Sequence, residues 1–113
     1  MMEFGLEEFI NRADGLLQIR KCELLPGDEV VLRTKNSLYS IEVESDDSYK
    51  VSGGWFDKMA LSPYKTTING CTWGGSGIKT DIVAARGLFL EFGNRLLTSR
   101  IREIILFSKS VKN

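Results

Sequence analysis

The sequence contains no histidine, and only two cysteines and two prolines among its 113 residues. Without histidine, Ser-His-acid and Cys-His catalytic arrangements are excluded within one chain, because both use an imidazole as the general base. A zinc site with several Cys or His ligands is excluded for one copy as well, since only Cys22 and Cys71 are present. Carboxylates such as Asp57 or Asp81, tyrosines and lysines remain for acid–base catalysis, and no spacing singles one out. We therefore predict no metal, no cofactor and no catalytic residue, while the enzyme question stays open.

Long apolar runs are also missing. The longest run, Ile104 to Phe107, falls far short of the roughly 20 residues that a membrane-spanning helix needs. The first residues lack the basic segment and apolar stretch of a signal peptide, and Glu7 and Glu8 would interrupt one. We therefore expect no membrane partner and a cytoplasmic location. In that location the cysteines are expected to be buried or idle thiols, although two cysteines far apart in sequence can still meet in a disulfide.

The length and composition are those of one globular domain. Apolar residues make up 42% of the chain and charged residues 27%, close to the globular average. A chain of 113 residues can bury one modest core and is too short to divide into two. The prediction is a single domain, 1–113, with a helix at about 3–17 and a β core at about 28–107.

The predicted helix rests on the spacing of apolar residues near the start of the chain. Acidic and polar residues fill the positions between them, so the pattern is typical of an amphipathic helix. Gly15 is a plausible stop, but the pattern continues for two more residues. The apolar stripe, expected to pack on the domain or on a second copy, consists of Leu6, Phe9, Ile10, Ala13, Leu16 and Leu17.

Alternating residues predict β-strands from position 28 onward. A turn at Lys35-Asn36-Ser37 joins two strands of a hairpin, and in the second strand Tyr39, Ile41 and Val43 face one way. A third strand starts at Tyr49, and the segment 55–64 is expected to be a loop or a single helical turn.

The second half predicts further short strands. Lys65 to Ile68 is expected to turn at Asn69-Gly70 and return over 71–73, because Asn-Gly favours tight hairpin turns. Strands are also predicted at 81–85 and 88–92. The segment 96–107 fits a strand and a helix, and its β-branched and aromatic residues favour the strand. The predicted fold is mainly β: a small antiparallel β-barrel or sandwich with one N-terminal amphipathic helix.

Charges balance overall but are unevenly distributed. Residues 1–57 hold twelve acids and six bases, a net charge of −6, whereas residues 58–113 hold nine bases and three acids, a net charge of +6. If the fold interleaves the two halves, these charges average out. Otherwise a basic face is left to meet an anion, a nucleic acid or the acidic face of another copy.

Candidate ligand-binding residues lie in three places. The glycine-rich loop after Cys71 can cradle an anion with its backbone amides, or can simply make a tight crossing. Tryptophans beside glycines can stack on a planar ligand or fill the core. Arginines on one strand face can bind phosphates or carboxylates, or can form a solvated face. The candidates are Trp55, Trp73, Gly74, Gly75, Ser76, Lys79, Arg95, Arg100 and Arg102.

The segment from Gly27 to Ser40, preceded by a helix, resembles the small bent-sheet barrel of Sm-like proteins. In that family a motif of the form G-x-x-V-x-V-x-L-x-N-G leads into a hairpin. Here Ser37 replaces the last glycine, Gly93-Asn94-Arg95 only loosely matches the second motif, and the segment 55–79 is foreign to the family. The chain also looks like one of the small bacterial families of β-rich proteins without an assigned function. Neither resemblance transfers a site.

Three functions stay open. The first is a non-catalytic protein-binding or self-assembling module, a possible homo-oligomer, as the absence of catalytic groups and the apolar stripe indicate. The second is a small barrel that binds nucleic acid or another anionic ligand through the arginines, Lys79 and the tryptophans. The third is a small-molecule enzyme with a carboxylate acid or base in a pocket near Trp73 and Asp81.

Overall fold

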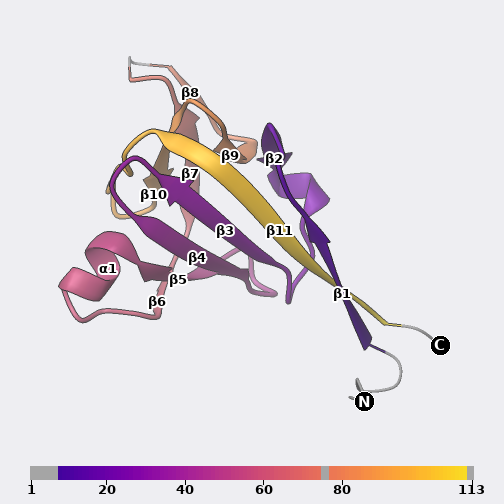
Figure 1. Cartoon of the computed structure of the whole chain (residues 1–113). Helices are drawn as coiled ribbons and strands as arrows, with labels where there is room; N and C mark the ends of the chain where they lie inside the picture. Colours follow the sequence, from indigo (N-terminus) through magenta and orange to yellow (C-terminus); the bar gives the residue numbers. More distant parts are fainter. Residues whose placement is uncertain (1–7, 75–76, 112–113) are drawn as a thin grey trace.

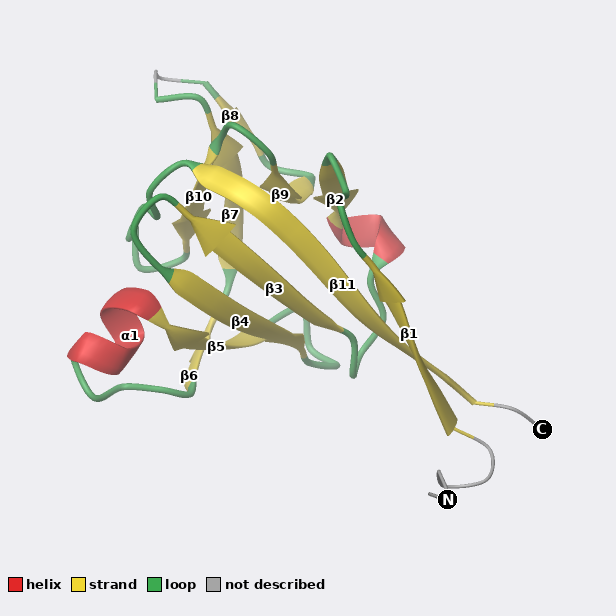
Figure 2. Cartoon of the chain, viewed as in Figure 1, coloured by secondary structure: helices red, strands yellow, loops and turns green. Residues whose placement is uncertain are grey.

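The computed structural model describes residues 8–74 and 77–111, which form mainly antiparallel strands (Figures 1 and 2). One short helix, α1 (Gly54–Lys58), and a 3-10 turn at Lys21–Glu23 interrupt them. The strands are β1 (Glu8–Ala13), β2 (Gln18–Arg20), β3 (Glu29–Thr34), β4 (Leu38–Val43), β5 (Tyr49–Gly53), β6 (Tyr64–Thr66), β7 (Ile68–Thr72), β8 (Ile78–Lys79), β9 (Ile82–Ala85), β10 (Phe89–Phe92) and β11 (Ile101–Val111).

The strands form three sheets. The largest has the order β1-β11-β3-β4-β5-β6, and two smaller sheets have the orders β10-β7-β8 and β2-β9. The smaller sheets lie behind the large one in Figure 1. Because the large sheet ends at β1 on one side and at β6 on the other, it is open. The prediction of a mainly β fold with antiparallel sheets is confirmed. Of the two predicted architectures, a barrel or a sandwich, the barrel is wrong, because the described strands do not close into one.

The β3–β4 hairpin shows why the alternating pattern was informative. Val30 pairs with Ile41 and Leu32 pairs with Tyr39, and all four side chains are buried. Their neighbours on the opposite face are half-buried or exposed. Burial of each aliphatic side chain contributes about 1.5–3 kcal/mol, so this hairpin is fixed in register by its inward face.

The core is one cluster that draws side chains from all three sheets. At its centre, the fully buried Phe56 ring lies 5.2 Å from Phe92, 5.4 Å from Tyr64 and 6.4 Å from Tyr39. A five-residue helix is too short to be stable alone. Packing of Phe56 therefore holds α1 on the domain, consistent with the expected helical turn.

The predicted N-terminal helix is wrong over residues 8–17, and residues 3–7 lie outside the described part. Glu8–Ala13 is β1, which pairs with β11 from Ala13↔Leu106 to Glu8↔Val111. A helix of this length is marginal in water, whereas the exposed edge of β11 offers a ladder of backbone hydrogen bonds. Pairing with a distant strand overrides the local helical spacing.

The Asn69-Gly70 turn is also wrong, because both residues lie inside β7. Gly70 has φ +143°, and a Cβ there would lie 2.3 Å from the carbonyl oxygen of Lys79. The glycine thus permits the close approach of β8, rather than a turn. The choice of a strand for 96–107 is confirmed from Ile101 onward by β11.

Both cysteines are free thiols: Cys22 is exposed and Cys71 is buried. Burial raises the pKa of the Cys71 thiol to about 12, so it stays protonated at neutral pH. The two therefore form no disulfide. Within the described residues, the helices are too short to cross a membrane.

Candidate functional site

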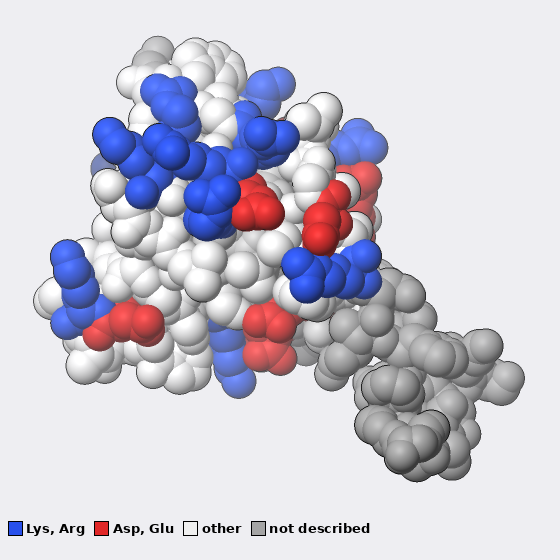
Figure 3. Space-filling view, viewed as in Figure 1, with Lys and Arg blue, Asp and Glu red and all other residues white. Residues whose placement is uncertain are grey.

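Five basic side chains gather at one end of the large sheet and are called the basic cluster here. In Figure 3 blue side chains crowd the end of the molecule where β3 finishes and β11 begins. They come from three segments: β3 with its turn, the turn after β9, and the start of β11. The members are Arg33, Lys35, Arg86, Arg100 and Arg102.

Strand pairing and loop hydrogen bonds assemble the basic cluster. Arg33 of β3 lies opposite Glu103 of β11, so Arg102 is one residue from it across the ladder. The backbone amide of Lys35 donates to the carbonyl of Arg100 at 3.1 Å. The turn that carries Arg86 is held where the Gly87 amide donates to the Ile101 carbonyl at 2.8 Å. These contacts join positions from 33 to 102 on one surface.

The basic cluster has little acidic compensation. Glu103 pairs with Arg33 at 2.9 Å, and both side chains are about half exposed. Such an exposed pair contributes about 0–1 kcal/mol. Arg100 donates to the Gly87 carbonyl at 2.6 Å and lies 4.8 Å from the centre of the Phe89 ring. In the described part of the chain, neither Arg86 nor Arg102 forms an ion pair, so their charge is available to a ligand.

A hollow of about 220 Å³ lies inside the basic cluster, between Arg33, Arg86 and Arg102, with Glu103 and Gly15 on its wall. Guanidinium groups present several donors in a fixed plane, and this geometry matches a phosphate. Three guanidinium-bearing side chains around one small hollow can therefore bind an oxyanion.

Two of the predicted candidates, Arg100 and Arg102, belong to the basic cluster. Arg95 is exposed at a position with φ +69° after β10, and Lys79 is exposed on β8, the end strand of a different sheet. Among the described residues, no hydrogen bond or ion pair joins either of them to the cluster. Their part in binding stays a prediction.

The glycine-rich loop is described only in part, since Gly75 and Ser76 lie outside the described residues. Trp73 is 53% exposed, so its side chain does not fill the hydrophobic core. Gly77 lies against the Trp73 ring, where a Cβ would be 3.1 Å from it. Gly74, with φ +103°, lies near Phe89, the ring that Arg100 also covers. Trp73 and Asp81 are both exposed, which gives no support to an enclosed enzyme pocket between them.

Trp55 occupies a different environment, on α1. It is half-buried, and its ring meets the Phe56 ring edge-on at 5.3 Å. It also lines a hollow of about 320 Å³ beside the β3–β4 turn. Of the two tryptophans, only Trp55 is both partly buried and part of the lining of a described hollow.

Sequence reasoning missed Arg33, Lys35 and Arg86 as site residues. The alternation of residues in β3 indicates that Arg33 faces outward, and Lys35 lies in a predicted turn. Their convergence with Arg102 depends on the pairing of β3 with β11, about 70 positions away. No local pattern carries that information.

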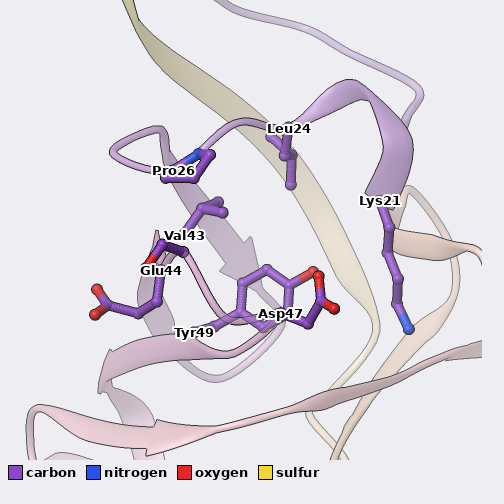
Figure 4. Close-up of a pocket in the computed structure, with 8 residues that line it drawn as sticks. Lys21, Leu24, Pro26, Val43, Glu44, Asp47 and Tyr49 are labelled. Carbon is purple, nitrogen blue, oxygen red and sulfur yellow. The ribbon is translucent and has the colours of Figure 1, made fainter.

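A larger hollow, of about 440 Å³, lies at the other end of the β3–β4 hairpin (Figure 4). Leu24, Val43 and the Tyr49 ring line it, with Asp47 beside Tyr49. Lys21 also borders it, but its ammonium donates to the Ile68 carbonyl at 2.7 Å. Burial, and then the charge of Asp47, raises the pKa of Tyr49. With its cation engaged and a carboxylate present, this hollow does not suit an anion.

No family model, no curated protein and no solved structure matches this chain. The resemblance to Sm-like proteins therefore stays a prediction, and functional inference rests on the site itself.

Proposed function

We propose that this chain is a non-catalytic binding domain whose ligand is a nucleic acid held through the basic cluster. The observation that carries the proposal is the convergence of five basic side chains, from three segments far apart in the sequence, around a single carboxylate. Nucleic acids bind such surfaces because Lys and Arg replace the counterions condensed on the phosphates.

The surroundings of the basic cluster favour a long ligand over a single phosphate ion. Lys35 and Arg100 lie outside the hollow between the other three arginines, so the charge extends over more than one oxyanion site. The outer face of the sheet next to the cluster carries some apolar side chains, with Leu38 opposite Arg33 in register and Val31 opposite Ile105. A polymer with repeated phosphates and apolar base surfaces is complementary to both features.

Binding of a fluorescently labelled mixed-sequence oligonucleotide tests the proposal by anisotropy at low salt. We expect the Arg86→Gln/Arg102→Gln variant to bind at least about tenfold more weakly, because each lost charged hydrogen bond costs about 1.5–3 kcal/mol. The matched control is Arg20→Gln/Lys50→Gln, which removes the same charge from exposed positions outside the cluster. It should lose less than about twofold. No binding by the original chain, or equal losses in the two variants, contradicts the proposal.

A second candidate function is self-assembly through an edge of the large sheet. β1 is the end strand of that sheet, so one side of its backbone has no strand neighbour among the described residues. Free edges of this kind can pair with another chain. Sedimentation velocity at increasing concentration tests the idea: a discrete dimer supports it, and a monomer at high concentration counts against it.

A further inference from the structure

A second hollow, of about 320 Å³, lies beside the β3–β4 turn that also carries Lys35 of the basic cluster. It lies between α1, the β3–β4 turn and the loop after β10. Its lining includes Asn36, Tyr39, Trp55, Lys58 and Leu97. These side chains combine a flat aromatic group, an aliphatic group and polar groups.

The Tyr39 hydroxyl is the most informative polar group. Tyr39 is only 4% exposed as a whole residue, and its hydroxyl has no hydrogen bond to another residue that the structure describes. Because no buried side-chain oxygen in the described part of the chain lacks a partner, the hydroxyl itself must reach the surface of the hollow that Tyr39 lines. It lies against Gly54, which also borders the hollow: a Cβ at Gly54 would be 2.5 Å from the hydroxyl oxygen. A phenolic hydroxyl at the surface of a hollow can donate to, or accept from, a polar group of a ligand.

The apolar lining suits a flat ring. Trp55 is half-buried, and the edge-on contact with Phe56 fixes its orientation. Leu97 is 50% exposed, so a large apolar side chain faces solvent at the rim. Lys58 is exposed and forms no ion pair within the described residues. A heteroaromatic ring with hydrogen-bonding edges, carried on an anionic chain, matches this set.

The hollow lies next to the basic cluster. Asn36 borders the hollow and directly follows Lys35 of the cluster. Its side-chain amide donates to the Ser99 hydroxyl at 2.7 Å, and Ser99 directly precedes Arg100. A chain whose phosphates lie on the cluster can therefore reach the hollow.

We propose that this hollow binds one base of a single-stranded nucleic acid, stacked beside Trp55 and hydrogen-bonded to Tyr39. The proposal rests on the proposed function and specifies its ligand further. In a duplex the bases are paired and stacked inside the helix, so the hollow selects single strands.

The experiment compares a single-stranded oligonucleotide with the duplex of the same sequence, using Trp73→Phe so that Trp55 is the only tryptophan, and exciting tryptophan selectively. We expect the single strand to bind at least about tenfold more tightly, in line with the energy of stacking one base, and to quench Trp55 fluorescence. Leu97→Asp should weaken single-strand binding about tenfold and leave duplex binding unchanged. Leu25→Asp is the matched control, since Leu25 is also an exposed leucine and lies before β3, at the opposite end of the β3–β4 hairpin from the hollow and the basic cluster.

The alternative outcomes are distinguishable. Equal affinity for single strand and duplex, with unchanged Trp55 fluorescence, overturns the base-binding inference and leaves the proposed function intact. Absence of binding to either form overturns both. A free nucleoside monophosphate serves as a further arm: if it quenches Trp55 at the same concentration as the oligonucleotide, the hollow is a nucleotide site, and the assignment to single strands is wrong.

Discussion

At Gly70 a single hydrogen atom in place of a side chain allows two strands to approach. Its φ of +143° lies in a region that L-residues rarely adopt, and the Lys79 carbonyl lies where a Cβ would be. The residue therefore carries two constraints, one conformational and one steric.

The matched pair Gly70→Ala and Gly87→Ala separates these constraints. Gly87 also has a positive φ, +87°, but a Cβ there would meet nothing within 4 Å. We expect Gly87→Ala to cost about 1–3 kcal/mol from backbone strain, and Gly70→Ala to cost more, because the β8 backbone must also move. Urea unfolding measures both. Equal losses would show that β8 does not pack against Gly70 as described.

The buried thiol of Cys71 predicts a pH dependence of stability. Its pKa is raised by burial from 9.0 to about 12 in the folded chain, whereas the unfolded thiol ionises at its ordinary value. Its contribution to the free energy of unfolding is therefore complete below about pH 9 and decreases as the pH rises towards 12.

Urea unfolding at pH 8 and pH 10 measures this effect as the difference between the original chain and Cys71→Ala. The original chain should lose more stability between the two pH values than Cys71→Ala does. The exposed Cys22 provides the control, since Cys22→Ala should follow the original chain. Identical pH dependence of all three proteins would exclude a buried thiol at position 71.

Among the elements, β11 is the strand on which the large sheet is built. It pairs with β3 from Ile101 to Phe107 and with β1 from Leu106 to Val111. Leu106 and Phe107 are the positions where both neighbours are present. Beyond Phe107 only β1 pairs with it.

Amide hydrogen exchange tests this arrangement. We expect Leu106 and Phe107 to exchange far more slowly than Ser108 to Val111, because strands on both sides protect a central strand better than one. Exchange in the urea-unfolded chain gives the intrinsic rates for comparison. Uniformly fast exchange after Ile105 would mean that β1 is not paired, and would restore the helix as an interpretation of the N-terminal segment.

The elements also show how far sequence reasoning reached. The β3–β4 hairpin was predictable because Tyr39, Ile41 and Val43 alternate with polar residues over a short stretch, and its turn lies between the strands. β1 was not, because its partner is nearly a hundred positions away and its apolar spacing also fits a helix. Arg100 and Arg102 could be singled out from their own segment, whereas the addition of Arg33 and Arg86 required the register of β11.

For the whole molecule, the uneven charge of the two halves is only partly averaged by folding. Two strands of the basic second half join four strands of the acidic first half in the large sheet: β11 lies between β1 and β3, and β6 is the end strand beside β5. Yet Arg33 and Lys35 of the first half join three arginines of the second half at one end. The interleaving thus concentrates positive charge, and a chain with zero net charge carries a basic surface.

The most direct test of nucleic-acid binding by the basic cluster is the salt dependence of affinity for a single-stranded oligonucleotide. Neutralising one phosphate contributes about −0.7 to the slope of log K against log salt concentration, so five basic side chains predict a slope of about −3.5. Arg86→Gln/Arg102→Gln should reduce its magnitude by about 1.4, and Arg20→Gln/Lys50→Gln should leave it unchanged. A flat salt dependence, or the same slope for the cluster variant as for the original chain, would contradict nucleic-acid binding through this cluster.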